Sequence, residues 1–222
     1  MAEPYRLRVG DQGPRQCSSV TCGSASLVVA RMLRDPRYAA GLLGDSPSAA
    51  GRFAAAERQV HRRTNAVVGP GRRLQLPWPQ ALGTPPWGAR HELESGAGVT
   101  GTRYRTRWVR WSRAALADAY AALHSTVAPE RPGVLFVGSS WLPRHVVLVI
   151  GSAVEVDGTP GSAPLASLTV YEPSSGRVIS LTADDLQRHT EVAGWRRCWV
   201  ALIPAPTVAG QAPRRSAPSD AA

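Results

Sequence analysis

The 222-residue chain contains no lysine, so all 26 of its basic side chains are arginine, and the net charge is +10. Exclusive arginine beside abundant Ala, Gly and Pro is typical of GC-rich coding, which explains part of this excess. A basic surface attracts nucleic acid, an anionic membrane or an acidic substrate. Because the arginines are scattered rather than gathered into one run, we favour an ordinary solvated surface.

Long apolar runs are also missing. The longest candidates, residues 27–30 and 146–150, are far shorter than the roughly 20 residues of a transmembrane helix, so we expect no membrane span. Residues 1–13 are polar and lack the apolar stretch and cleavage site of a secretory signal. We therefore expect a cytoplasmic protein, although export by a route without such a signal stays open.

Cysteine is scarce, with three residues at Cys17, Cys22 and Cys198. An odd number in a chain without a signal argues against a disulfide framework. The spacing also lacks the two close Cys pairs of a zinc site, so we predict no metal and no other cofactor. A reactive thiol is the remaining possibility of interest.

The pattern of the chain predicts an α+β fold in which helices come first and an antiparallel sheet follows. We expect one domain over residues 1–203 and a disordered Pro/Ala-rich tail over residues 204–222. Prolines interrupt residues 65–111, which we expect to be a long connection with one or two short strands. Helices are predicted over residues 24–33, 49–60 and 113–124, and Ser112 is a suitable N-cap for the last of these. Thr182 with Asp185 resembles a capping box that opens a small helix over about residues 184–188. Strands are predicted over residues 134–137, 145–150, 168–171, 177–181 and 198–203.

Cys22 lies where a loop leads into the first predicted helix, which is apolar around most of its circumference. The partial positive charge at a helix N-terminus favours a thiolate. Gly23 would let another chain approach closely, and the amide of Gln16 can donate to an oxyanion. Taken alone, a free cysteine is most often a small buried side chain. The hypothesis that Cys22 is a reactive thiol therefore needs a base and an acid elsewhere in the sequence.

Two residues of the second half supply such partners. His145 begins one apolar run, and Glu172 ends the next. If the two strands fold back about the turn signal Asp157-Gly158, His145 lies nearly opposite Glu172. A carboxylate beside an imidazole is the base-and-orienter pair that a thiol nucleophile requires. The remaining histidines have polar neighbours and are predicted to lie on the surface: His61, His91, His124 and His189.

These motifs, in this order, resemble the papain-like cysteine peptidases. The shared features are a Gln six residues before a Cys-Gly that opens a helix, a His leading an apolar strand, and an acidic-Pro-x-x-Gly turn. The resemblance covers residues 16–33 and 133–186. It is closest to the bacteriocin-processing branch, the double-glycine leader peptidases and their free-standing relatives.

The resemblance implies a role for each matching residue. Cys22 would be the nucleophile, His145 the general base, and Gln16 with the Cys22 amide the oxyanion hole. Glu172 stands where that branch usually has Asp. The gap of about 120 residues from Cys22 to His145 exceeds that of compact leader peptidases. It implies an enlarged middle section that forms a wall or lid of the cleft.

We therefore expect a thiol hydrolase that cleaves a peptide or protein substrate through Cys22, His145 and Glu172. Two alternatives stay open at this point. The same chemistry serves acyltransferases and transglutaminase-like enzymes, in which an amine replaces water as the acceptor. The other alternative is a noncatalytic basic domain that binds nucleic acid or an acidic partner, although no zinc finger, phosphate loop or RNA-binding signature supports it.

Overall fold

The chain forms an α+β fold in which an N-terminal group of helices precedes most of the strands. The computed structural model describes residues 3–44, 48–155, 165–188 and 192–206. The first helices are α1 (Cys22–Arg34), α2 (Pro36–Leu43), α3 (Ala49–Asn65) and α4 (Pro86–Glu92), with short turns η1 (Pro70–Arg72), η2 (Gln80–Leu82) and η3 (Leu93–Ala97). The remaining elements are β1 (Tyr104–Trp108), α5 (Arg113–Thr126), β2 (Gly133–Gly138), β3 (Pro143–Glu155), β4 (Leu165–Tyr171), β5 (Val178–Thr182), α6 (Ala183–Gln187) and β6 (Arg197–Pro204).

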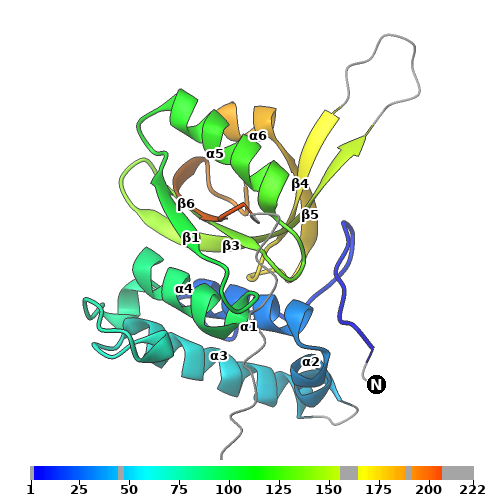
Figure 1. Cartoon of the computed structure of the whole chain (residues 1–222), viewed down its shortest axis with the longest axis vertical. Coiled ribbons are helices and arrows are strands. Elements are labelled where there is room, and N and C mark those ends of the chain that lie inside the picture. Colours follow the sequence, from blue (N-terminus) through cyan, green and yellow to red (C-terminus); the bar gives the residue numbers. More distant parts are fainter. Residues whose placement is uncertain (1–2, 45–47, 156–164, 189–191, 207–222) are drawn as a thin grey trace, which may run out of the picture.

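The six strands make one open antiparallel sheet with the order β1-β6-β2-β3-β4-β5. Helices cover both of its faces (Figure 1): α1 to α4 form a layer on one side, and α5 and α6 lie on the other. The apolar side chains accordingly divide into two cores, one beneath each layer. In the described part of the chain, every helix is too short or too polar to cross a bilayer.

Helix α1 is the central element of the first layer. All of its residues except Arg31 and Arg34 are buried, which confirms the prediction from its apolar circumference. Such a helix can exist only between other elements, because burial of its side chains on every face supplies the stabilisation that an isolated helix lacks. It packs against α2 and α3 on one side and against β3 on the other. Its first residue, Cys22, is thereby held at the boundary between helices and sheet.

The predicted helices that correspond to α5 and α6 are confirmed, and each begins at its predicted N-cap. The Ser112 side chain accepts a hydrogen bond from the Ala115 amide at the start of α5. Thr182 and Asp185 form the expected capping box at α6. In the segment that sequence reasoning left unplaced, the structure has α4 and the edge strand β1. The domain continues through Pro204, the end of β6, and residues 207–222 of the predicted tail lie outside the described residues.

Candidate active site

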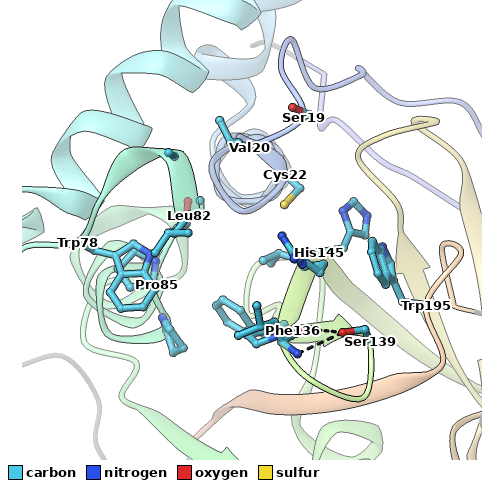
Figure 2. A pocket seen from close by; sticks show the side chains of 18 residues that line it. Ser19, Val20, Cys22, Trp78, Leu82, Pro85, Phe136, Ser139, His145 and Trp195 are labelled. Carbon is cyan, nitrogen blue, oxygen red and sulfur yellow. Dashed lines mark hydrogen bonds between the residues drawn. The ribbon is translucent and has the colours of Figure 1, made fainter.

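A cavity of about 740 Å³ opens between the helical layer and the end of the sheet. Its walls come from three parts of the chain: the start of α1, the segment from Trp78 to Pro86, and the ends of β2 and β3 with Trp195. Most lining side chains are apolar or aromatic. Cys22 and His145 are both among them, and Figure 2 shows the sulfur of Cys22 pointing into the cavity on the side where His145 lies. The structure therefore joins two predicted site residues in one cleft.

Cys22 is the first residue of α1, so its sulfur lies at the N-terminal end of a buried 13-residue helix. The residue is 4 % exposed and carries a free thiol. Its side chain is near enough to His145 to raise the pKa of that imidazole. The first amides of a helix have no acceptor within the helix, and their partial positive charge stabilises an anion at this position. The site can therefore hold a thiolate beside an imidazole.

The imidazole of His145 is in turn bonded to Glu172. The distance from His145 Nε2 to Glu172 Oε1 is 2.7 Å, and both residues are buried. Because Nε2 faces the carboxylate, Nδ1 is the ring nitrogen left for Cys22. The three side chains thus lie in the order Cys22, His145, Glu172, with the imidazole between the thiol and the carboxylate. This juxtaposition agrees with what the motif spacing predicts.

The predicted strand register, however, is wrong. It would pair Tyr171 with a residue at about 144–146, whereas Tyr171 lies opposite Leu148. The turn signal Asp157-Gly158 on which that register rested lies outside the described residues. His145 and Glu172 still meet because β3 and β4 are antiparallel neighbours. The start of β3 and the residue that follows β4 therefore share one end of the sheet.

The carboxylate of Glu172 is fixed by the turn that follows it. Oε1 accepts a hydrogen bond from the Ser174 amide and Oε2 one from the Ser175 amide, each at 2.7 Å. Burial alone would raise the pKa of Glu172, but the hydrogen bonds from His145, Ser175 and Ser174 hold it well below its ordinary range. Glu172 is thus an anion at any neutral pH, and it can orient and stabilise a protonated imidazole.

The charge state of His145 follows from the same contacts. Burial alone would lower the pKa of His145, but the interactions with Cys22 and Glu172 outweigh it and raise the pKa to about 9. The imidazole is therefore protonated at neutral pH while its neighbours are in place. A protonated His145 can stabilise a thiolate and later give up its proton.

An N-terminal strap, residues 8–17, braces the Glu172 turn. The backbone N–H of Gln16 donates to the Pro173 carbonyl, and the backbone N–H of Gly13 donates to the Gly176 carbonyl, both at 2.8 Å. Gly176 has a φ of 76°, and a Cβ there would lie 2.5 Å from the Gly13 carbonyl oxygen. Glycine is therefore required at this position. Because the strap runs directly into the loop before α1, it couples the position of Cys22 to that of Glu172.

Gln16 does not take the position that the oxyanion role requires. Its side-chain Nε2 donates to the Ser18 carbonyl at 2.7 Å, and Gln16 is not among the residues that line the cavity. Its Oε1 is buried without a hydrogen-bond partner in the part of the chain that the structure describes. Gln16 lies in the loop that leads to Cys22. In this structure its amide is directed at the loop itself rather than at the cavity.

The segment that sequence reasoning could not place forms one wall of the cavity. Trp78, Leu82 and Pro85 line it, opposite the sheet residue Phe136 (Figure 2). The closely spaced Pro and Trp residues of the segment were the available signal, because such residues form rigid apolar surfaces with few conformations. The Trp78 and Trp87 rings also pack edge to face, with centroids 5.3 Å apart.

Close packing connects this wall to helix α1. A Cβ on Gly23 would lie 2.7 Å from Thr84 Cβ, so the close approach that Gly23 permits is by the chain's own Thr84 rather than by a substrate. The neighbouring Ser24 hydroxyl lies 3.0 Å from Thr84 Oγ1 and 3.3 Å from His61 Nδ1. His61 Nε2 contacts the Gln80 carbonyl at 3.1 Å. These contacts hold the wall at a set distance from Cys22.

The surface prediction for the histidines needs correction. His61 is 6 % exposed and His91 is 9 % exposed, because polar partners satisfy their rings inside the helical layer. His91 Nδ1, for example, lies 3.0 Å from Gln75 Oε1. His124 is partly buried and stacks on Tyr120, and His189 lies outside the described residues.

The other two thiols differ from Cys22 in their surroundings. Cys198 is buried in the second core, where burial raises its pKa to about 12. Cys17 is exposed, yet partial desolvation and a hydrogen bond with Glu57 raise the pKa of its thiol. Neither lines the cavity. Among the described residues, no cluster of three or more His, Cys, Asp or Glu side chains is arranged to hold a metal ion.

No protein-family model matches this chain, and no curated protein matches it in sequence.

Proposed function

We propose that the protein is a papain-like thiol hydrolase that cleaves a peptide or amide bond through Cys22. The observation that carries this proposal is that Cys22 and His145 line one cavity while His145 is hydrogen-bonded to the buried carboxylate of Glu172. A structural cysteine needs no such partners. A nucleophilic thiol needs a base within hydrogen-bond reach and a third group that orients that base.

The proposed reaction is acyl transfer in two stages. The Cys22 thiolate adds to the carbonyl carbon, and as the C–N bond breaks, His145 gives its proton to the departing amine. A thioester remains on Cys22. His145, now neutral, removes a proton from water, and the hydroxide displaces the Cys22 thiolate as the product acid leaves. Every proton that is released is returned, and the two stages need no co-reactant besides water.

The tetrahedral intermediate of each stage carries an oxyanion that needs donors. The backbone amide of Cys22, in the first turn of α1, has no acceptor within the helix and can donate to this oxyanion. Gln16 could add a second donor only if its side-chain amide leaves the Ser18 carbonyl. We therefore assign Gln16 a contributory role, dependent on substrate binding, and place the main donor on the helix.

The architecture supports the papain-like version of this chemistry. A nucleophile at the start of a buried helix faces a histidine on an antiparallel sheet, and the cleft runs between the two layers. The acidic residue follows the neighbouring strand, as the motif order implies. The wall from Trp78 to Pro86 is the additional feature of this cleft.

Alkylation of Cys22 by iodoacetamide tests the proposal directly. At pH 6 we expect Cys22 to react at least tenfold faster than Cys17, as located by mass spectrometry, because a thiolate is the reactive form. His145→Ala should abolish this advantage, and the matched variant His124→Ala should retain it. Equal labelling of Cys22 in all three proteins would remove the basis for a hydrolase.

A cleavage assay then tests the reaction itself. Incubation with a mixed peptide library, followed by mass spectrometry of the products, should show hydrolysis by the wild type. Cys22→Ser should lose it by a factor of about 10³ or more, because the hydroxyl is a far weaker nucleophile at neutral pH. Cys17→Ser is the control and should retain full activity.

A further inference from the structure

The cavity that Cys22 lines keeps an apolar surface as far as its mouth. Leu82 reaches it from the wall of residues 78–86, and Leu142 reaches it from the turn before β3. These two side chains also remain open to solvent, since Leu82 is 63 % exposed and Leu142 is 52 % exposed. A side chain that lines a cavity and is more than half exposed lies at the mouth. The apolar surface therefore continues outward instead of ending inside the protein.

The wall of residues 78–86 offers few hydrogen-bonding groups to a ligand. Three of its nine residues are prolines, which have no N–H: Pro79, Pro85 and Pro86. Three further N–H groups donate to carbonyls of the protein itself: those of Trp78, Leu82 and Gly83. The carbonyls of Gln80 and Gly83 accept hydrogen bonds from side chains of α3, and Trp78 Nε1 is buried. The wall thus presents apolar surface rather than the main-chain groups that hold an extended peptide.

The size of the cavity is a second indication of what it holds. Its volume of about 740 Å³ lies within the range of roughly 300–1,000 Å³ that is typical of sites for whole small molecules. A single peptide side chain would leave part of this space unfilled, and unfilled apolar space forfeits contacts. An aliphatic chain can fill it and pass the mouth, because it bends at each bond and needs no hydrogen-bond partner.

The proposed chemistry places the acyl part of the substrate in this cavity. The sulfur of Cys22 points into it (Figure 2), and the carbonyl carbon of the substrate becomes bonded to that sulfur. The acyl group then stays on Cys22 until water attacks, whereas the amine takes a proton from His145 and departs. The group that the cavity selects is therefore the one attached to the carbonyl carbon.

We propose that the cavity binds a long aliphatic acyl chain, so that the preferred substrate is an amide of a long-chain carboxylic acid. The inference rests on the proposed function and names its substrate class. The Cys22 thiolate displaces the amine, which leaves with the proton of His145, and water then releases the long-chain acid from the thioester. Peptides without such a chain remain substrates, but slower ones.

Calorimetry on Cys22→Ser measures binding of the chain without turnover. Octanamide carries an eight-carbon chain, acetamide is the short analogue, and acetyl-phenylalanine amide offers a peptide side chain instead. Because each buried methylene strengthens binding by roughly threefold, octanamide should bind at least about 30-fold more tightly than acetamide. It should also bind more tightly than acetyl-phenylalanine amide. Equal or tighter binding of the latter would show that the cavity holds an amino-acid side chain, and would overturn the proposal.

Two double variants, made in Cys22→Ser, locate the binding. Leu82→Asn/Leu142→Asn makes the mouth polar and should weaken octanamide binding by roughly fivefold or more. The matched control Leu43→Asn/Leu165→Asn makes the same change at exposed leucines that do not line the cavity. Its affinity should stay within about twofold of Cys22→Ser, because distant substitutions act independently. An equal loss in both double variants would contradict the proposed site.

A series of acyl 4-nitroanilides then measures the effect of the chain on the reaction of the wild type. From the acetyl to the octanoyl compound, kcat/KM should rise by a factor of about 30 or more. Hydrolysis of peptides together with a flat series would overturn the acyl-chain proposal and leave the hydrolase intact. Tight octanamide binding without hydrolysis of any amide would instead remove the proposed function and leave the apolar site.

Discussion

The two helical layers that cover the sheet are built on different principles. In the layer of α1 to α4, charged and polar side chains are buried among the apolar ones, including Glu57, His61 and Glu92. In the layer of α5 and α6, the buried side chains are apolar except for Tyr120, whose hydroxyl donates to the Ala166 carbonyl at 2.8 Å. Cys22 and the wall of its cavity both belong to the polar layer.

The difference separates two contributions to the fold: the apolar layer mainly supplies stability, and the polar layer mainly selects one arrangement of the side chains. An apolar core tolerates several arrangements of similar volume, whereas a buried polar group must meet its own partner. The contacts of Glu57 with the Cys17 amide and of Arg63 with Glu92 are of this second kind. The polar layer therefore admits one arrangement around the cleft, and the apolar layer stabilises it from the other face of the sheet.

The largest effect on stability is expected from Leu123→Ala in the apolar layer. Leu123 is fully buried in α5, so its truncation should lower the free energy of unfolding by about 2–5 kcal/mol. Urea denaturation measures this loss. Iodoacetamide should still alkylate Cys22 of the folded Leu123→Ala variant at a rate within about twofold of wild type. Leu27→Ala, an equal truncation in α1, should instead lower both the stability and the rate of Cys22 alkylation. Identical behaviour of the two variants would contradict the proposed difference between the two layers.

A smaller effect on the free energy of unfolding is expected from a change of pH, through the titration of His145. The folded-state pKa of His145 lies at about 9, above the unfolded value. Its contribution to stability is therefore fully present below pH 6.5 and is lost as pH rises through 9, which amounts to roughly 3 kcal/mol. Unfolding measured from pH 6 to pH 10 should show this decline. His145→Asn does not titrate and should show a distinctly flatter profile; an unchanged slope would mean that other groups cause it.

Glu172 acts in the opposite direction on the pH scale. Its folded-state pKa is lowered, so its contribution is present above the unfolded value near 4.5 and is lost only as pH falls through the lower folded value. The pair is therefore most stabilising between about pH 4.5 and 6.5.

The smallest effect on stability is expected from substitutions of two fully buried serines of α1, Ser24 and Ser26. The Ser24 hydroxyl contacts His61 and Thr84, so Ser24→Ala should cost about 1–2 kcal/mol by leaving those partners unsatisfied. The Ser26 hydroxyl has no hydrogen-bond partner within the described residues, so Ser26→Ala should be neutral or slightly stabilising. Thermal unfolding measures both. A larger loss for Ser26→Ala would show that the polar network is not what secures α1.

Local patterns predicted those parts of the fold that depend on near neighbours in the chain. The apolar circumference of α1 indicated a buried helix, and Ser112 and Thr182 marked the starts of α5 and α6. The meeting of His145 and Glu172 was predicted because each adjoins the end of a strand that an antiparallel hairpin would bring together. The register of those strands was predicted wrongly, since it rested on a turn position rather than on strand contacts.

Contacts distant in sequence escaped prediction. His61 is followed by arginines and was expected at the surface, yet Ser24 and the Gln80 carbonyl satisfy its ring inside the helical layer. The segment that contains Trp78 has no periodicity, because its conformation is set by packing rather than by a repeating pattern. The direction of the Gln16 amide was equally inaccessible, since it depends on the position of the Ser18 carbonyl.

Local residue patterns are enough to predict the elements and the candidate site residues: an apolar helix that opens with Cys22, a strand led by His145, and a carboxylate at Glu172. Hydrophobic period and capping chemistry are local, so they can be recognised along the chain. Which groups surround the sulfur, and which segments line the cleft, depend on contacts between residues that are far apart in the chain. The fold also brings Arg188 beside Arg197, although they look scattered in the sequence, because the sheet order, not chain distance, sets which side chains share a pocket.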